Sequence, residues 1–131
     1  MLEDVANATV GVLAHVSIHQ GPKVGRYGVN LADISRVGVT AIMRALSSAD
    51  VVVIDEIGPM ELCSPAFVDA VGKVFCSAKP LVGTIHRSAC HPMIESIKGN
   101  PRYEILEVTP QNRDQVPFLV EGKLKEADIL L

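Results

Sequence analysis

The residues best suited to chemistry are two adjacent carboxylates, Asp55 and Glu56, which directly follow the apolar run Val-Val-Val-Ile at residues 51–54. A short run rich in Val and Ile is typical of a strand buried on both faces, as in a parallel sheet. The acidic pair would then lie at the carboxyl end of that strand, where open α/β sheets bind their ligands. There the first carboxylate can help to hold Mg²⁺, and the second can polarise an attacking water.

This acidic pair matches the Walker B arrangement of phosphate-hydrolysing domains. A Walker A loop, G-x-x-x-x-G-K-[ST], would supply the backbone amides and the lysine that bind the phosphates. The two Gly-Lys pairs of the chain begin at Gly72 and Gly122, and neither is followed by Ser or Thr. The sequence therefore carries the metal-binding and water-activating half of a nucleotide site without the phosphate-binding half.

Length and composition predict one folded domain over residues 1–131, because 48% of the residues are hydrophobic. The net charge is −3 and the basic residues form no dense run, which argues against a nucleic-acid partner. No apolar run is long enough to cross a membrane, and the acidic start of the chain is unlike a secretory signal. Three widely spaced cysteines favour the reduced thiols of a cytoplasmic protein over a disulfide framework.

Hydrophobic periodicity predicts the elements that position the acidic pair. Alternation over residues 9–18 predicts a strand, and a period of 3.6 from Asp33 predicts a helix with Asp33 as its N-cap. Ser64 and Pro65 predict the cap and first turn of the next helix. The later part of the chain is predicted to contain strands at 80–85 and 103–108, a short helix at 92–97, and a last helix from Thr109 to about residue 126 with a possible kink at Pro117. Helices alternating with strands indicate an α/β fold with a mostly parallel sheet and flanking helices.

Three phrases in one order carry a resemblance to a known family: V-G-R-Y-G-V at 24–29, D-E-I-G-P-M-E-L at 55–62 and N-R-D at 112–114. The chain resembles the small P-loop nucleoside-triphosphatase family that includes the cancer-related nucleoside-triphosphatase, over the C-terminal two-thirds of a member. The resemblance implies a RecA-like P-loop NTPase fold, which we expect to be N-terminally incomplete because the first strand, the P-loop and its helix are absent. It also implies Mg²⁺-dependent hydrolysis of ATP, GTP and related nucleotides to diphosphate and phosphate.

The resemblance also implies roles for single residues. Asp55 would bind Mg²⁺ through water, and Glu56 would be the general base. Glu61, in the same phrase, could support these residues without touching the ligand, but it is expected to be a carboxylate of a loop or helix entry. The sequence therefore predicts the chemistry at the acidic pair and assigns none to Glu61.

Four further residues are predicted to contact the nucleotide: Arg26, His86, Asn112 and Arg113. Each has a simpler explanation. Arg26 could be a surface residue stacked on Tyr27, and His86 could be a solvated loop residue. Asn112 and Arg113 would lie in the first turn of the last helix, where polar side chains satisfy free backbone amides.

Two other functions remain open from the sequence. The chain could be a non-catalytic interaction module, or half of a split site completed by another chain, and an exposed sheet edge would favour self-association. It could also be a small zinc-binding protein using His86, Cys90 and His91, although structural zinc sites usually have paired ligands at tighter spacing.

Overall fold

The computed structural model describes residues 1–126 and divides into two compact units, Met1–Ile94 and Glu95–Leu131, each considered by itself. The elements are β1 (Leu2–Asp4), β2 (Thr9–Gly11), β3 (Ala14–His15), β4 (Lys23–Val24), β5 (Tyr27–Val29), α1 (Leu31–Asp33), the π-helical segment η1 (Ile34–Val39), α2 (Thr40–Ser48), β6 (Val52–Ile57), the short 3₁₀ helix η2 (Glu61–Cys63), α3 (Pro65–Phe75), β7 (Leu81–Ile85), α4 (Pro92–Gly99) and α5 (Val116–Glu126). None of the helices in residues 1–126 is both long and apolar enough to cross a lipid bilayer.

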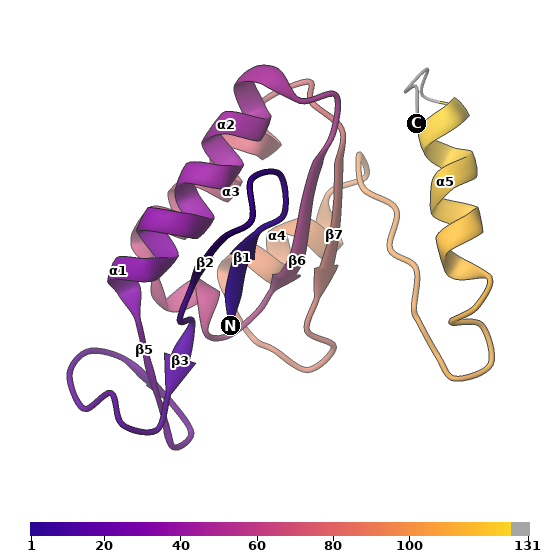
Figure 1. Cartoon of the computed structure of the whole chain (residues 1–131). Coiled ribbons are helices and arrows are strands. Elements are labelled where there is room, and N and C mark those ends of the chain that lie inside the picture. Colours follow the sequence, from indigo (N-terminus) through magenta and orange to yellow (C-terminus); the bar gives the residue numbers. More distant parts are fainter. Residues whose placement is uncertain (127–131) are drawn as a thin grey trace. The chain divides into compact units, whose positions relative to one another are not determined.

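The parallel pair β6 and β7 is the part of the sheet that the sequence predicts, and α3 connects the two strands (Figure 1). Val52 pairs with Leu81 and Ile54 with Gly83, after which the register shifts before Ile57. Such a shift is a β-bulge, an irregularity that re-aims the side chains it contains. Asp55 and Glu56 lie within this bulge.

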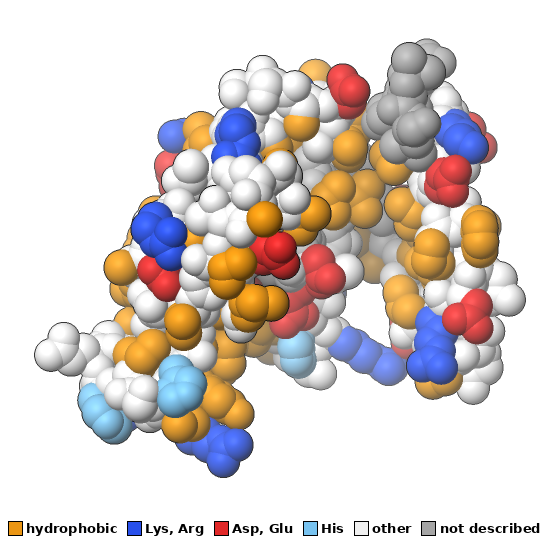
Figure 2. Space-filling view, in the orientation of Figure 1, with side chains coloured by type: hydrophobic (Ala, Val, Ile, Leu, Met, Phe, Trp, Pro, Cys, Tyr) orange, Lys and Arg blue, Asp and Glu red, His pale blue; other side chains and the backbone are white. Residues whose placement is uncertain are grey.

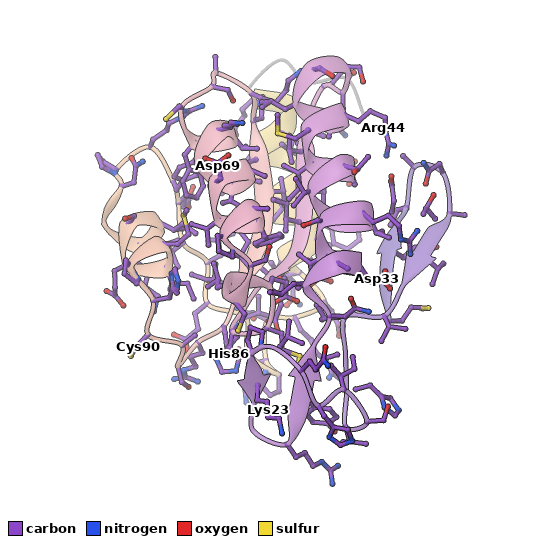
Figure 3. The ribbon with its side chains drawn as sticks, turned by 90° about the vertical axis from the view of Figure 1, so that its left-hand side faces the viewer. Lys23, Asp33, Arg44, Asp69, His86 and Cys90 are labelled. Carbon is purple, nitrogen blue, oxygen red and sulfur yellow. The ribbon has the colours of Figure 1, made fainter. Side chains whose placement is uncertain are left out.

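The prediction that this strand is buried on both faces is wrong for one of them. Val52 and Ile54 are buried, whereas Val53 is 66% exposed. Helices α2 and α3 both lie on one side of the β6–β7 pair, as two views of the molecule show (Figures 1 and 3). Because the side chains of a strand alternate between the two faces, only one set of them is covered by these helices.

The helix predicted from Asp33 is present but begins earlier, at Leu31. Its N-cap is Asn30, whose side-chain Oδ1 accepts a hydrogen bond from the Asp33 N–H at 3.0 Å. Asp33 has helical dihedral angles, φ −72° and ψ −33°, so it cannot be the cap. The apolar stripe is confirmed, since Ile34, Val37 and Ile42 are buried.

The single strand predicted at residues 9–18 is instead two short strands. β2 pairs with β1 in one antiparallel hairpin, and β3 belongs to a separate antiparallel sheet of order β3-β5-β4. Between them the Val12 N–H donates to Asp33 Oδ2 at 2.8 Å, so a side chain of the helix takes the place of a strand partner. The chain then turns at His15, whose carbonyl accepts from the Ile18 N–H.

The start of α3 follows the prediction closely. Ser64 is the N-cap, and its Oγ accepts a hydrogen bond from the Phe67 N–H at 3.1 Å. Pro65 occupies the first turn, where its missing N–H costs nothing. The apolar face of the helix is buried through Phe67, Val71 and Val74. This helix therefore fixes the far end of the loop that follows the acidic pair.

In the second unit, the strand predicted at 103–108 is wrong. These residues have no regular structure, and Ile105 and Val108 are 49% and 59% exposed. A strand needs a neighbouring strand for its backbone groups, and residues 95–126 contain none. Apolar periodicity alone could not reveal that the described part of this unit has no strand of its own beside residues 103–108.

The last helix, α5, begins at Val116 rather than at Thr109. Asn112 holds the preceding residues in a turn, because its Oδ1 accepts from the Thr109 N–H at 2.7 Å and its Nδ2 donates to the Glu107 carbonyl at 2.9 Å. Pro117 lies in the first turn of α5 and therefore produces no kink within the helix.

Candidate active site

The acidic pair lies at the carboxyl end of β6, as the sequence predicts. Asp55 is exposed, and its Oδ1 accepts a hydrogen bond from Thr84 Oγ1 of β7 at 2.7 Å. The peptide bond between Asp55 and Glu56 is cis. The two parallel strands thus bring a carboxylate and a hydroxyl together at one sheet edge, and Thr84 is a site neighbour that the sequence analysis missed.

Glu56 is half-buried and lies beside the backbone of Gly58. A Cβ atom placed on Gly58 would be 2.8 Å from Glu56 Oε1 and 3.0 Å from Glu61 Oε2. The Gly58 N–H donates a hydrogen bond to Glu61 Oε2 at 3.1 Å. The carboxylates of Glu56 and Glu61, five positions apart in the sequence, therefore both approach the place that a side chain at position 58 would occupy.

Glu61 is only 8% exposed, which the sequence analysis did not anticipate. Burial raises the pKa of its carboxyl, and the negative charges of Glu56 and Asp55 raise it further, while N–H groups of Glu61 and Gly58 lower it. The sequence signal that could have predicted this burial is that Glu61 lies directly before Leu62 and four residues after Ile57, both of which are buried. Figure 2 shows acidic side chains gathered over the β1–β2 hairpin and the end of β6.

Asp55 fits a magnesium ion of the kind that keeps most of its waters. Mg²⁺ is usually held by one or two carboxylates together with waters and substrate phosphates, rather than by a complete set of protein ligands. Asp55 offers an exposed carboxylate with the Thr84 hydroxyl next to it. Within residues 1–126, no three His, Cys, Asp or Glu side chains are grouped closely enough to hold a metal ion by themselves.

Because no such group is found within residues 1–126, a zinc site at His86, Cys90 and His91 has no support. His86 Nδ1 accepts a hydrogen bond from the Ser88 N–H at 3.2 Å, and His91 Nδ1 accepts from the Met93 N–H at 3.0 Å. Each imidazole thus accepts a hydrogen bond from the backbone N–H two residues further along the chain. His86 directly follows β7 and is exposed, so its predicted contact with a nucleotide stays a prediction (Figure 3).

Arg26 lies in the turn that joins β4 and β5, and its geometry matches the stacked alternative. Its Nη2 donates to the Tyr27 hydroxyl at 3.2 Å, and its Cζ is 5.3 Å from the centroid of the Tyr27 ring. Asn112 and Arg113 belong to the second unit and precede α5, where Asn112 shapes the turn described above. The nucleotide contacts of these three residues stay predictions.

Comparison with known proteins places these features in context. A family model described as NTPase matches residues 1–120. The nucleoside-triphosphatase THEP1 of Methanosarcina acetivorans is 44% identical over 122 residues, which are 93% of this chain and 67% of that protein. The nucleoside-triphosphatase THEP1 of Thermofilum pendens is 45% identical over 117 residues, 88% of this chain and 64% of that protein.

A solved structure gives a similar result at the level of the fold. The crystal structure of THEP1 from the hyperthermophile Aquifex aeolicus matches with a TM-score of 0.81 and 29% sequence identity. The match covers 87% of this chain and 70% of that one. The chain spans about two thirds of the length of the curated relatives that it matches.

Proposed function

The chain belongs to the NTPase family and has the α/β fold of a P-loop NTPase, and from this premise we propose that it takes part in the hydrolysis of nucleoside triphosphates to diphosphate and phosphate. The observation that carries the proposal is the carboxylate pair in the bulge at the end of β6. Asp55, oriented by Thr84, would hold Mg²⁺, and Glu56 would accept the proton of the attacking water. When bound, the ion would neutralise charge on the phosphates and orient them.

The two carboxylates are suited to different tasks because their surroundings differ. Asp55 is exposed and receives the Thr84 hydroxyl, which fixes the direction of its oxygens. Glu56 is half-buried against Gly58, which restricts the positions that its carboxylate can take. A restricted base next to an exposed metal-binding carboxylate is the arrangement needed to orient water for attack on a phosphate.

The reaction also requires a loop that binds the phosphates, and residues 1–131 contain no Walker A sequence. We propose that this loop is supplied from outside the 131 residues, either by a preceding segment or by another chain. A chimaera that joins the N-terminal segment of the Methanosarcina acetivorans relative to this chain tests the first source. Phosphate release by the chimaera but not by the chain alone would support it.

The general-base role of Glu56 is tested by Glu56→Gln, which keeps the size of the side chain but removes its proton-accepting charge. Phosphate release from Mg-ATP and Mg-GTP should fall by about 100-fold or more. Nucleotide binding should persist, so a ligand at 100 times its Kd should still add about 2.7 kcal/mol to the free energy of unfolding. Turnover of Glu56→Gln equal to that of the parent chimaera would refute the role.

The exposed residue Glu3 offers the matched control. Glu3→Gln makes the same chemical change on β1, outside the proposed site, and should leave phosphate release unchanged. If both variants lose turnover equally, the loss reflects a general effect of removing negative charge rather than a catalytic role of Glu56.

Self-association is a second candidate function, and one observation favours it. Val53 is 66% exposed on β6, and within the described residues β6 pairs only with β7. An exposed apolar strand with an open edge is a common site of association. Sedimentation over a range of protein concentrations tests it, with a constant monomer mass as the contrary result.

A further inference from the structure

The loop between β6 and α3 is closed by contacts that the hydrolysis reaction itself does not require. The Leu62 N–H donates to the Gly58 carbonyl at 3.0 Å, and the Gly58 N–H donates to Glu61 Oε2 at 3.1 Å. The Cys63 thiol donates to the Pro59 carbonyl at 3.3 Å. Both backbone groups of Gly58 are therefore occupied within a single turn, which holds this residue in one place.

Gly58 in turn limits the space available to Glu56. A Cβ on Gly58 would lie 2.8 Å from Glu56 Oε1, closer than real Cβ atoms approach, and 3.0 Å from its Cδ, so the carboxylate would have to move. The Glu56 carboxylate thus packs directly over the Gly58 backbone, and only a residue without a side chain allows this approach. Any shift of Gly58 would be transmitted to the carboxylate.

We propose that Glu61 is a positioning residue that, through its hydrogen bond to the Gly58 N–H, holds the surface on which the Glu56 carboxylate rests. The inference deepens the proposed hydrolysis and rests on it for its functional meaning. Glu61 would not touch the reacting atoms. It acts by keeping Gly58, and therefore Glu56, in one arrangement.

The burial of Glu61 supports a structural role for its hydrogen bond to the Gly58 N–H. Its carboxyl is 8% exposed, beside two other acidic residues and with a backbone N–H as its hydrogen-bond donor. Burying an ionisable group near like charges is unfavourable. An apolar residue of similar size would avoid that cost, but it would leave the buried Gly58 N–H without its acceptor.

The test compares Glu61→Ala, which removes the acceptor, with Glu61→Gln, which keeps an acceptor oxygen at the same distance along the side chain. In the active chimaera, Glu61→Ala should lower kcat by about tenfold to 100-fold while KM changes by less than about twofold, because the base is misplaced and binding is intact. Glu61→Gln should recover at least half of kcat. Equal kcat values for parent and Glu61→Ala, or a loss confined to KM, would overturn the proposal.

A pair of glycine variants tests the contact between Gly58 and the Glu56 carboxylate. Gly58→Ala places a methyl group against Glu56 and should lower kcat by at least about tenfold. Gly72→Ala makes the same change in α3, where an added Cβ meets nothing within 4 Å, and should leave kcat unchanged. Equal kcat values for the two variants would contradict the proposed contact.

A measurement that needs no activity separates this proposal from the proposed function. In the 131-residue chain, the NMR signals of the Gly58 amide and the Glu56 Cδ should both move in Glu61→Ala and stay near the parent positions in Glu61→Gln. Unchanged signals in Glu61→Ala would overturn the positioning role whether or not the protein hydrolyses nucleotides. Moved signals without any Glu56-dependent turnover would retain the contact and reject the hydrolysis.

Discussion

Single side chains at the end of β6 differ in what surrounds them, and this decides what each can do. Asp55 is exposed and bonded to the Thr84 hydroxyl, so it can reach a cation from the sheet edge. Glu61 is buried and its carboxylate accepts the Gly58 N–H, so it is not open to a ligand in the same way. Two residues of one acidic phrase are therefore accessible to a ligand to different degrees, although both carry the same chemical group.

The pKa of Glu61, raised above its ordinary value of 4.5 chiefly by burial, makes a prediction about pH. Above the folded-state pKa, Glu61 is ionised in both states and destabilises the fold; below 4.5 it is neutral in both. Stability should therefore fall as pH rises from 4.5 through the folded-state pKa. Glu61→Gln, always neutral, should become more stable than the parent across this interval.

Urea unfolding of both proteins between acid and neutral pH measures this difference. Glu3→Gln, on an exposed residue, serves as the control and should follow the parent at every pH. A difference between Glu61→Gln and the parent that does not change with pH would show that ionisation of Glu61 is not its cause.

At the scale of secondary-structure elements, two helices begin directly after a residue whose side chain accepts a hydrogen bond from a free backbone N–H of the first turn. Asn30 caps the helix that starts at Leu31, and Ser64 caps α3. Ser64 is 2% exposed and connects the loop of the acidic pair to the buried face of α3. The cap therefore contributes both to helix stability and to the position of the loop.

Ser64→Ala removes the acceptor for the Phe67 N–H and should lower the free energy of unfolding by about 1 kcal/mol. Urea unfolding measures the change. Ser96→Ala is the control, since Ser96 is exposed within α4 and should change stability by only a few tenths of a kcal/mol. Equal stabilities of the two variants would mean that the Ser64 cap makes no net contribution.

At the scale of the larger unit, three polar contacts attach the β1–β2 hairpin and the residue after it to the helix at residues 31–48. Arg44 forms an ion pair with Asp4, Arg36 Nη2 donates to the Val10 carbonyl at 3.1 Å, and the Val12 N–H donates to Asp33. Figure 3 shows Asp33 and Arg44 on the side of the helix that faces the hairpin. The hairpin is thus joined to the core through side chains distant in sequence.

Arg44→Ala should lower the free energy of unfolding by about 2 kcal/mol, because Asp4 is 5% exposed and would lose its charged partner. Lys73→Ala is the contrast. It breaks an exposed i,i+4 pair with Asp69 and should cost no more than about 0.5 kcal/mol. Hydrogen exchange should quicken first in the β1–β2 hairpin of Arg44→Ala, and uniform exchange throughout the unit would contradict the proposed attachment.

The sequence by itself determined the elements whose signals are local. The cap and proline at Ser64, the apolar run before Asp55, and the strand ending before His86 are all where their patterns predict. These elements depend on residues a few positions apart, so no knowledge of the rest of the fold is needed to predict them. Three phrases in one order, at 24–29, 55–62 and 112–114, also indicated the family, which the comparisons confirm.

Only the tertiary structure decided the features that depend on distant partners. Thr84 on β7 donates a hydrogen bond to Asp55 on the neighbouring strand β6. Asp33 accepts a hydrogen bond from the Val12 N–H instead of capping its own helix. The burial of Glu61 and the exposure of Val53 follow from which face of β6 is covered and how its loop closes. Local periodicity contains no information about these partners, because burial and hydrogen bonding between distant segments are set when the elements pack together.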